Sequence, residues 1–107
     1  MEKPRIRLPK QARKGEIIQI KTLISHIMEN GHRRDRNANL IPRKIINTFA
    51  CEFNGRPVFS CDLDTAVAEN PYIAFTARME EGGTFRFTWR DDDGSAITAD
   101  ETIVVIP

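Results

Sequence analysis

An alternation of apolar and polar residues constrains the fold of this chain more than any other feature of its sequence. The alternation is cleanest over residues 84–90, where Phe85, Phe87 and Trp89 occupy every second position and polar residues fill the others. A period of two is typical of a half-buried β-strand, because successive side chains of a strand point to opposite faces of its sheet. No segment shows the sustained 3.6-residue period of an amphipathic helix, so the sequence predicts an all-β protein.

Six further segments carry the same pattern. With residues 84–90, the predicted strands are 6–8, 17–26, 45–53, 58–63, 72–79 and 96–106, with 10–16 as a connection and 27–44 as a long loop. The pair Asn54-Gly55 is a strong signal for a tight hairpin turn. Seven short strands in 107 residues fit one domain, residues 1–107, folded as an immunoglobulin-like antiparallel β-sandwich of about seven strands.

Membrane and export signals are not visible in the sequence. No apolar run approaches the roughly 20 residues that a membrane helix needs. The charged N-terminal residues have no apolar stretch behind them that would form a signal peptide. We therefore expect no membrane partner.

Charge is distributed unevenly along the chain. Residues 1–44 hold 12 Lys/Arg and 4 Asp/Glu, a net +8, whereas residues 45–107 hold 4 and 11, a net −7. Such a split is typical either of a dipolar surface that orients a charged partner or of solvated loops that differ in sign. The densest positive charge lies in the predicted loop, whose far end we expect Leu40 and Ile41 to attach to the body. The predicted partner-binding residues of this loop are Arg33, Arg34, Arg36, Arg43 and Lys44.

Nucleic acid is the less favoured partner for the basic region. Proteins that bind single strands interleave basic residues with aromatic residues on which bases stack. Residues 1–44 contain no Phe, Tyr or Trp. A charged protein partner fits better.

The Asp-Asp-Asp-Gly run at residues 91–94 suggests a calcium site. An EF-hand loop, however, needs a longer spacing of carboxylates and a Glu at its twelfth position, where this chain has Thr102. The alternative is a turn, which Asp caps and Gly permits. We expect the turn.

Cys51 together with His26, His32 and Met28 suggests a blue-copper site on the same kind of sandwich. Such a site needs a second His close to the cysteine, and none follows Cys51 or Cys61. The alternative role of Cys51 is that of a small core hydrophobe between two phenylalanines of one strand face. We therefore predict no metal ligands and no other cofactor.

Catalytic signatures are missing as well. A reactive thiol needs a nearby cation or a helix N-terminus, and both cysteines lie in strand patterns beside aromatic residues. No Ser/His/Asp ordering, phosphate-binding loop or His-Glu-x-x-His motif occurs. The residues thus predict a binding module and not an enzyme.

A series of short motifs makes the sequence similar to a known family. The motifs are residues 4–9 (Pro-Arg-Ile-Arg-Leu-Pro), 14–16 (Lys-Gly-Glu), 20–26 (Ile-Lys-Thr-Leu-Ile-Ser-His), 28–31 (Met-Glu-Asn-Gly), 41–47 (Ile-Pro-Arg-Lys-Ile-Ile-Asn), 54–55 (Asn-Gly), 68–72 (Ala-Glu-Asn-Pro-Tyr), 83–89 (Gly-Thr-Phe-Arg-Phe-Thr-Trp) and 91–95 (Asp-Asp-Asp-Gly-Ser). None is specific alone. In their order and spacing they resemble SoxZ, a subunit of the thiosulfate-oxidation sulfur carrier, nearly from end to end.

The resemblance implies a non-catalytic subunit that forms a heterodimer with a SoxY-like chain. In that family the partner carries sulfur intermediates on a cysteine in a Gly-rich C-terminal arm and presents the arm to other sulfur-oxidation enzymes. This sequence ends Ile-Val-Val-Ile-Pro at residues 103–107, so we expect the carrier cysteine on the partner. The resemblance also implies a periplasmic location, with export alongside a signal-bearing partner.

An oxidising periplasm would permit a disulfide between Cys51 and Cys61, and two hairpin registers bear on it. A two-residue turn at Asn54-Gly55 places the two thiols on opposite faces, whereas a five-residue loop places them opposite each other. The Asn-Gly pair favours the first register, and the alternation of Phe49, Cys51 and Phe53 against the return strand favours the second. We expect unpaired thiols, with the disulfide left open.

A second class of function stays open beside the carrier subunit. It is a stand-alone ligand-binding or metal-binding β-sandwich, and its most specific form is an electron-transfer protein. Metal analysis of the purified protein distinguishes the two.

Overall fold

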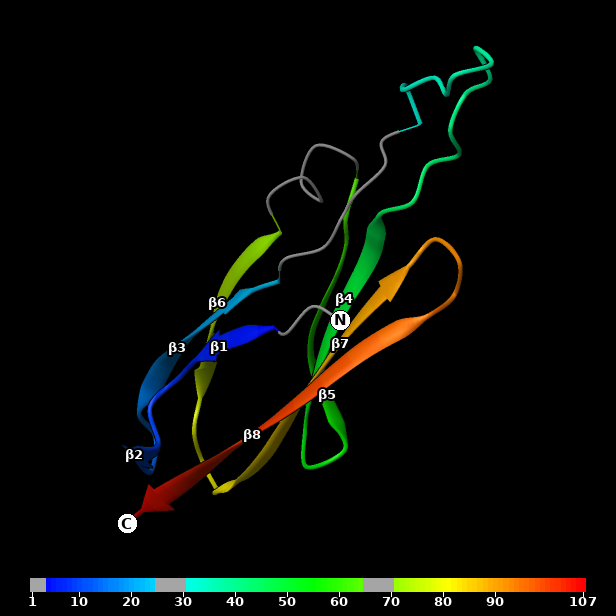
Figure 1. Cartoon of the computed structure of the whole chain (residues 1–107). Coiled ribbons are helices and arrows are strands. Elements are labelled where there is room, and N and C mark those ends of the chain that lie inside the picture. The colour runs from blue at the N-terminus through cyan, green and yellow to red at the C-terminus, as the bar shows by residue number, and fades with distance from the viewer. Residues whose placement is uncertain (1–3, 25–30, 65–70) are drawn as a thin grey trace.

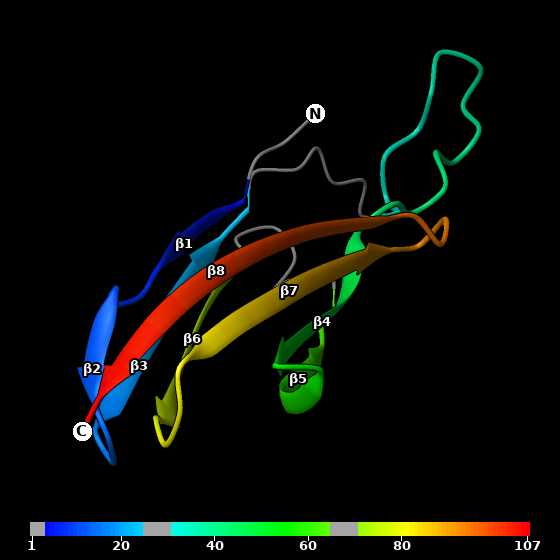
Figure 2. The ribbon, with the colours of Figure 1, turned by 90° about the horizontal axis from the view of Figure 1, so that it is seen from below.

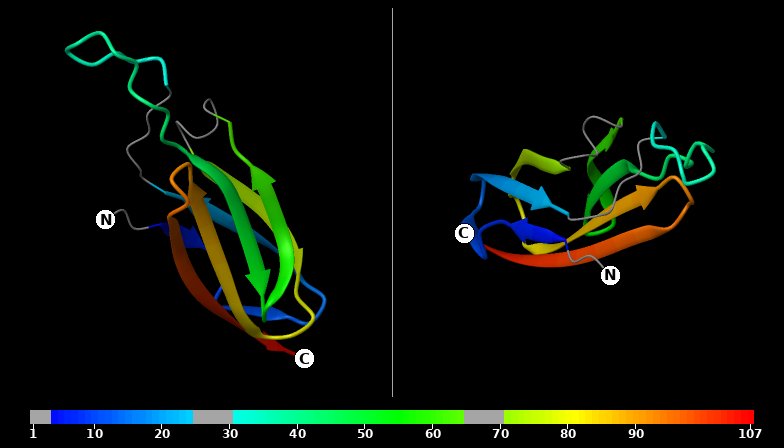
Figure 3. Two further views of the ribbon diagram at one scale, coloured as in Figure 1. Left: turned by 90° about the vertical axis from the view of Figure 1, so that its right-hand side faces the viewer. Right: turned by 45° about the horizontal axis from the view of Figure 1, so that its top comes forward.

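The structure is a computed structural model that describes residues 4–24, 31–64 and 71–107. Within these residues eight strands and no helix are present, and the strands form two sheets. The three-stranded sheet has the order β1 (Arg5–Arg7), β3 (Ile17–Leu23) and β6 (Tyr72–Arg78). The five-stranded sheet has the order β2 (Gln11–Arg13), β8 (Ala96–Ile106), β7 (Gly83–Asp91), β4 (Ile46–Phe53) and β5 (Arg56–Asp62). Figure 1 shows the sheets as two facing layers, which Figures 2 and 3 show from other sides.

The predicted all-β, immunoglobulin-like sandwich is confirmed. Each of the seven predicted strands has a counterpart whose ends differ from the prediction by three residues at most. The largest difference is in β3, which ends at Leu23, while the predicted continuation to His26 lies outside the described residues. No helix in the described part of the chain is long and apolar enough to cross a membrane.

The connection predicted at residues 10–16 contains an additional strand, β2, so this part of the prediction is wrong. β2 pairs in parallel with the end of β8, with Ala12 opposite Val105. The Ala12 side chain is buried. A strand of three residues is too short to show a readable alternation, and β2 is extended because β8 provides its hydrogen-bond partners.

The inward face of β7 is deeply buried. Phe85, Phe87 and Trp89 are each no more than 1% exposed, as their shared strand face predicts. The ring centroid of Trp89 lies 5.3 Å from that of Phe49 on β4, in a tilted arrangement that is favourable for aromatic pairs. From the other sheet, Phe75 approaches the same Phe49 ring edge-on at 6.2 Å. The core is therefore an aromatic layer between the two sheets.

The inward face of β3 is buried as predicted, including one polar residue. Ile18 and Ile20 are buried, and so is Thr22. The Thr22 hydroxyl donates a hydrogen bond of 3.0 Å to the carbonyl oxygen of Ile73. This bond satisfies the hydroxyl inside the core and removes the cost of an unpaired buried donor.

The β4–β5 hairpin reconciles the two registers that the sequence left in conflict. Asn54 and Gly55 both have positive φ, 51° and 83°, as a two-residue hairpin turn of the favoured type requires. A β-bulge between Cys51 and Glu52 then shifts the register by one residue. Beyond the bulge Cys51 pairs with Phe59.

In the same shifted register Phe49 pairs with Cys61, so the two cysteines share a face without lying opposite each other. Cys51 and Cys61 are both free thiols. The tight turn and the matching strand faces are thus both present, and the bulge is the element that sequence reasoning missed.

Truncating Trp89 tests the aromatic layer. Trp89→Ala is expected to lower the free energy of unfolding by about 3–5 kcal/mol, the range for removing a large buried aromatic side chain. Urea denaturation, followed by circular dichroism, measures this change. The matched control is Trp89→Phe, which keeps a ring against Phe49 and removes an indole N–H that has no acceptor among the described residues. The control is expected to cost much less, and an alanine variant as stable as the wild type would contradict the prediction.

Candidate functional site

The predicted basic loop forms a long projection from one end of the sandwich. We call residues 31–44 the finger. Figures 1 and 2 show it extending away from the two sheets, at the end of the molecule opposite the C-terminus. Residues 32–40 are all exposed. The molecule measures 63 Å along its longest axis against 21 and 19 Å across.

The finger tip is a small closed turn built around Asp35. One carboxylate oxygen of Asp35 accepts hydrogen bonds from the backbone amides of Asn37, at 2.9 Å, and Asn39, at 3.0 Å. Ala38 has a φ of 64°, a left-handed conformation that the surrounding hydrogen bonds hold in place. Below the tip, Arg34 and Leu40 form an isolated antiparallel β-bridge. The tip thus has a defined backbone shape although it has no apolar core.

Leu40 does not attach the finger to the body. Its side chain is 54% exposed, so the prediction for Leu40 is wrong, whereas Ile41 is half-buried. The amide of Ile41 donates a 2.8 Å hydrogen bond to the carbonyl of Arg33, which closes the finger on itself. An apolar residue at the end of a projecting loop cannot reach the core, and the attachment is polar instead.

The Asp92 carboxylate holds the base of the finger. It accepts two hydrogen bonds from the Arg43 guanidinium, both of 2.8 Å, one of 2.9 Å from the Asn47 amide group and one of 3.2 Å from the backbone amide of Ile45. The two-pronged contact with Arg43 is a strong, directional type of ion pair. The bond from Arg43 is the main reason that the pKa of Asp92 lies below its ordinary value. Lys44 adds a 3.2 Å ion pair with Asp93.

The structure divides the five predicted partner-binding residues into two groups. Arg43 and Lys44 are engaged with the turn at residues 91–94, at the base of the finger. Arg33, Arg34 and Arg36 lie further out and are exposed. A guanidinium nitrogen of Arg34 donates a 2.8 Å hydrogen bond to the carbonyl of Ala38, which fixes its direction at the tip. Partner binding by these five residues remains a prediction.

The aspartates of residues 91–94 act as turn-capping groups. The Asp91 carboxylate accepts a 2.8 Å bond from the amide of Asp93, and the Asp93 carboxylate accepts one of the same length from the amide of Ser95. Gly94 has a φ of 87°. Within residues 4–24, 31–64 and 71–107, no three His, Cys, Asp or Glu side chains are grouped to hold a metal ion. The carboxylates of Asp91, Asp92 and Asp93 are directed at amides and cations of the chain itself.

The two thiols are unsuited to nucleophilic chemistry. Cys51 is buried, and burial is the main reason that the pKa of its thiol rises to about 12. Burial also raises the pKa of Cys61 on the neighbouring strand. Since the thiolate is the reactive form, both groups are weak nucleophiles at neutral pH. Of the other residues considered for copper, His32 is exposed at the start of the finger, and His26 and Met28 lie outside the described residues.

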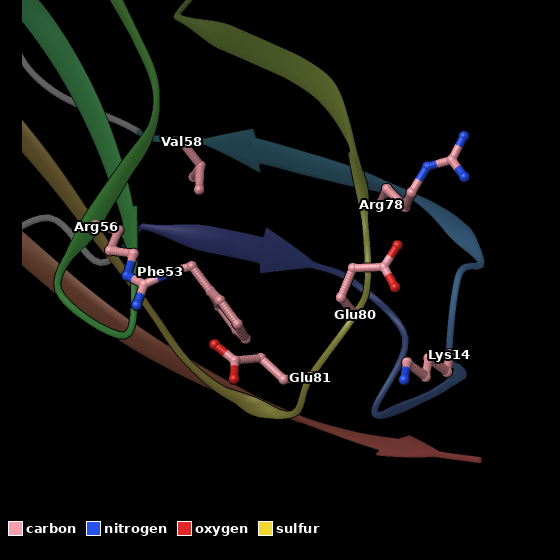
Figure 4. A pocket seen from close by; sticks show the side chains of 7 residues that line it. All are labelled: Lys14, Phe53, Arg56, Val58, Arg78, Glu80 and Glu81. Atoms are coloured by element: carbon pink, nitrogen blue, oxygen red, sulfur yellow. The ribbon is translucent and has the colours of Figure 1, made fainter.

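A separate hollow of about 530 Å³ lies at the other end of the sandwich, where the β4–β5 hairpin, the β6–β7 turn and the β2–β3 turn meet (Figure 4). Its lining residues are Lys14, Phe53, Arg56, Val58, Arg78, Glu80 and Glu81. Cations and carboxylates are mixed there, and the lining has no thiol, hydroxyl or imidazole. The hollow therefore lacks the hydroxyl or thiol nucleophile and the histidine base of a Ser/His or Cys/His site.

These features define an immunoglobulin-like β-sandwich with a charged, anchored finger and, among the described residues, no assembled nucleophile or metal cluster. The sequence model of the family described as sulphur oxidation protein SoxZ matches residues 6–102. The chain therefore belongs to the SoxZ family, which is part of the sulfur-oxidation system. A search of curated protein sequences finds no match.

Solved structures confirm the fold at low sequence identity. A superoxide reductase (neelaredoxin) from Ignicoccus hospitalis superposes with a TM-score of 0.74 at 15% identity, covering 98% of this chain and 83% of that chain. The sulfur carrier protein SoxY from Chlorobium limicola f thiosulfatophilum superposes with a TM-score of 0.69 at 14% identity, covering 97% of this chain and 79% of that chain. At these identities the similarity shows the sandwich fold alone.

The anchor at Asp92 has a testable pH dependence. Because its folded pKa is lowered, the Asp92 carboxylate stabilises the native state fully above its unfolded pKa of about 3.9, and the contribution is lost as the pH falls through the folded pKa. The urea midpoint of Asp92→Asn is therefore expected to lie below that of the wild type at pH 7, with the gap closing in acid. A gap that does not change with pH would contradict this. The control is Asp62→Asn, an exposed carboxylate on β5, which should change the midpoint little.

Proposed function

We propose that this chain is the non-catalytic subunit of a heterodimer with a SoxY-like chain. In this heterodimer the C-terminal cysteine of the partner carries covalently bound sulfur intermediates during thiosulfate oxidation. Membership of the SoxZ family supports the proposal, and so does the fold shared with a protein named as the sulfur carrier SoxY.

The observation that carries the proposal is the state of the two thiols. A sulfur carrier must present a reactive thiolate to several enzymes in turn. The only two cysteines of this sequence lie in strands of the sandwich with raised pKa values. A chain of a sulfur-oxidation family with such thiols fits a role in which the partner provides the carrier cysteine.

The proposal also concerns the cellular location of the heterodimer. We propose the periplasm, with export of this chain in complex with a signal-bearing partner. Expression with and without the partner, followed by fractionation, tests this: the chain should enter the periplasm only in the presence of the partner.

A stand-alone redox or metal-binding sandwich is the second candidate. The observation that favours it is the superposition on a protein named as a superoxide reductase. Metal analysis of protein purified from its native source separates the candidates. Stoichiometric iron or copper in the isolated chain would favour the second.

Substitution of both cysteines tests the carrier proposal directly. The double variant Cys51→Ala and Cys61→Ser, co-expressed with the SoxY-like chain of the same organism, is expected to form the complex and to keep thiosulfate-dependent turnover close to that of the wild type. Mass spectrometry of the complex after turnover with thiosulfate and the oxidising enzymes of the system, which accept the two electrons released when thiosulfate joins the thiol, should show added sulfur on the partner only. Loss of turnover in a folded, intact complex, or sulfur on this chain, would overturn the proposal.

The finger is proposed to steer encounters with the enzymes that act on the loaded heterodimer. The triple change of Arg33, Arg34 and Arg36 to Gln is expected to slow association with those enzymes at low salt and to matter little at high salt. The reason is that exposed charge acts on association rates and is screened within about 8–10 Å at physiological salt. Stopped-flow mixing measures the rates.

The control for this experiment removes the same charge from the sandwich body, with Lys10, Arg13 and Arg90 changed to Gln. It should slow association less than the finger variant. Wild-type rates for the finger variant at low ionic strength would show that the finger does not steer. The heterodimer should form in both variants, since stable interfaces depend mainly on apolar burial.

A further inference from the structure

The outer face of the three-stranded sheet carries cations in an arrangement that is unfavourable for the isolated chain. Arg7 on β1 pairs with Lys21 on β3, so two positive side chains stand directly opposite each other. Arg5, two residues from Arg7, lies on the same face. Like charges opposite each other in an antiparallel pair lower the stability of a sheet. The three strands pair in register in spite of this loss of stability.

None of the outward residues that the structure describes on these three strands is a carboxylate. These outward residues are Arg5, Arg7, Ile17, Gln19, Lys21, Leu23, Tyr72, Ala74, Thr76 and Arg78, which alternate with the core residues and match across the strands. We call this surface the basic face. None of its four cations forms an ion pair or a side-chain hydrogen bond with another described residue. In contrast, Arg43 and Arg86 each pair with an aspartate.

The basic face also exposes apolar surface. Tyr72 is 50% exposed and Ile17 is 59% exposed. The register places Tyr72 and Arg5 on either side of Leu23. A hollow of about 180 Å³ opens there, lined by the cations Arg5, Arg7 and Lys21 together with Thr22, Leu23 and Tyr72. Tyr and Arg are the residue types enriched at the energetic centres of protein interfaces.

The outer face of the five-stranded sheet differs in its charge, although it also exposes an apolar residue, Val104 on β8, which is 59% exposed. Arg86 on β7 is neutralised by Asp100 on β8, with a nitrogen–oxygen distance of 3.0 Å. The other outward residues of β7 and β8 include one cation, Arg90, and the small uncharged residues Thr84, Thr88, Thr98 and Thr102. Mixed charge and short side chains need no partner. The unbalanced charge of the described strands is therefore concentrated on the basic face.

We infer that the basic face receives an acidic surface of a partner protein, and that within the proposed function this partner is the SoxY-like subunit. The inference rests on that proposed function. Charge complementarity selects the partner, because carboxylates of an opposing surface would relieve the repulsion between Arg7 and Lys21. The exposed Tyr72 and Ile17 supply the apolar burial that a small anion alone would not use.

Binding to the SoxY-like chain of the same organism tests the inference, with the dissociation constant measured at about 0.01 M and about 1 M salt, where the Debye lengths are ~30 and ~3 Å. The triple change of Arg5, Arg7 and Lys21 to Gln is expected to weaken binding by roughly tenfold or more at low salt, with a smaller effect at high salt. The matched control is the body variant with Lys10, Arg13 and Arg90 changed to Gln, which removes the same charge. It should leave the constant within about twofold of the wild type.

A second measurement uses the wild-type chain and so does not depend on a variant folding. Tyr72 is the single tyrosine of the chain, so acetylation by N-acetylimidazole, read by mass spectrometry on this chain, reports on the basic face alone. Tyr72 is expected to react in the free chain and to be protected in the complex.

The possible outcomes separate the two proposals. If the wild-type chain does not bind the SoxY-like chain, the proposed function fails, and the assigned occupant fails with it. If the wild type binds but the basic-face variant binds equally well, or both triple variants lose the same affinity, only the placement of the partner is overturned. The same holds if Tyr72 stays reactive in the complex, or if the basic face proves to join two copies of this chain.

Discussion

Contacts of the Phe49 ring link the two layers of the sandwich, and the rest of the structure depends on them. The ring is fully buried and lies 5.3 to 6.3 Å from four other rings. Three of these belong to its own sheet, and the fourth, Phe75, belongs to the opposite one. A shift of β4 by one residue would direct Phe49 to solvent and replace its ring with the small side chain of Thr48 or Ala50, so this ring sets the register of β4 against both β5 and β7.

The finger is anchored as a consequence of that register. With Phe49 opposite Trp89, the first residues of β4 lie beside the last residues of β7, at one end of this strand pair. Arg43 therefore stands beside Asp92, and the amide of Asp92 donates a 2.9 Å bond to the carbonyl of Ile45. A basic pair just before one strand and an acidic run just after its neighbour is a signal that could have predicted this contact from the sequence, once the two strands were known to pair.

The sequence predicted those parts of the fold that depend on local pattern, and it failed where a distant partner decides the outcome. The alternation on β7 is long enough to show its period, and every predicted inward residue of that strand is buried. β2 has three residues and exists because β8 pairs with it. The bulge beside Cys51 leaves no local trace, because it reconciles a tight turn with the matching of two strand faces. At the candidate site the sequence did not indicate that two of the five predicted partner-binding residues, Arg43 and Lys44, also form ion pairs at the base of the finger. Partner binding by all five stays a prediction.

Strand pairing also places side by side residues that are far apart in the sequence, and this bears on the kind of partner that the chain can bind. Residues 1–44 contain no aromatic residue, which argued against a surface that binds single-stranded nucleic acid. The fold places Tyr72, from the acidic half of the chain, on the outward face of β6 beside β3. The positive and negative charges nearly cancel over the whole chain, but the outer face of the three-stranded sheet is positive. Cys51 is buried in the core, and Cys61 packs against it. A chain built in this way is suited to hold a partner in a defined orientation, and under the proposed function the chemistry of sulfur transfer depends on the thiol of the SoxY-like subunit.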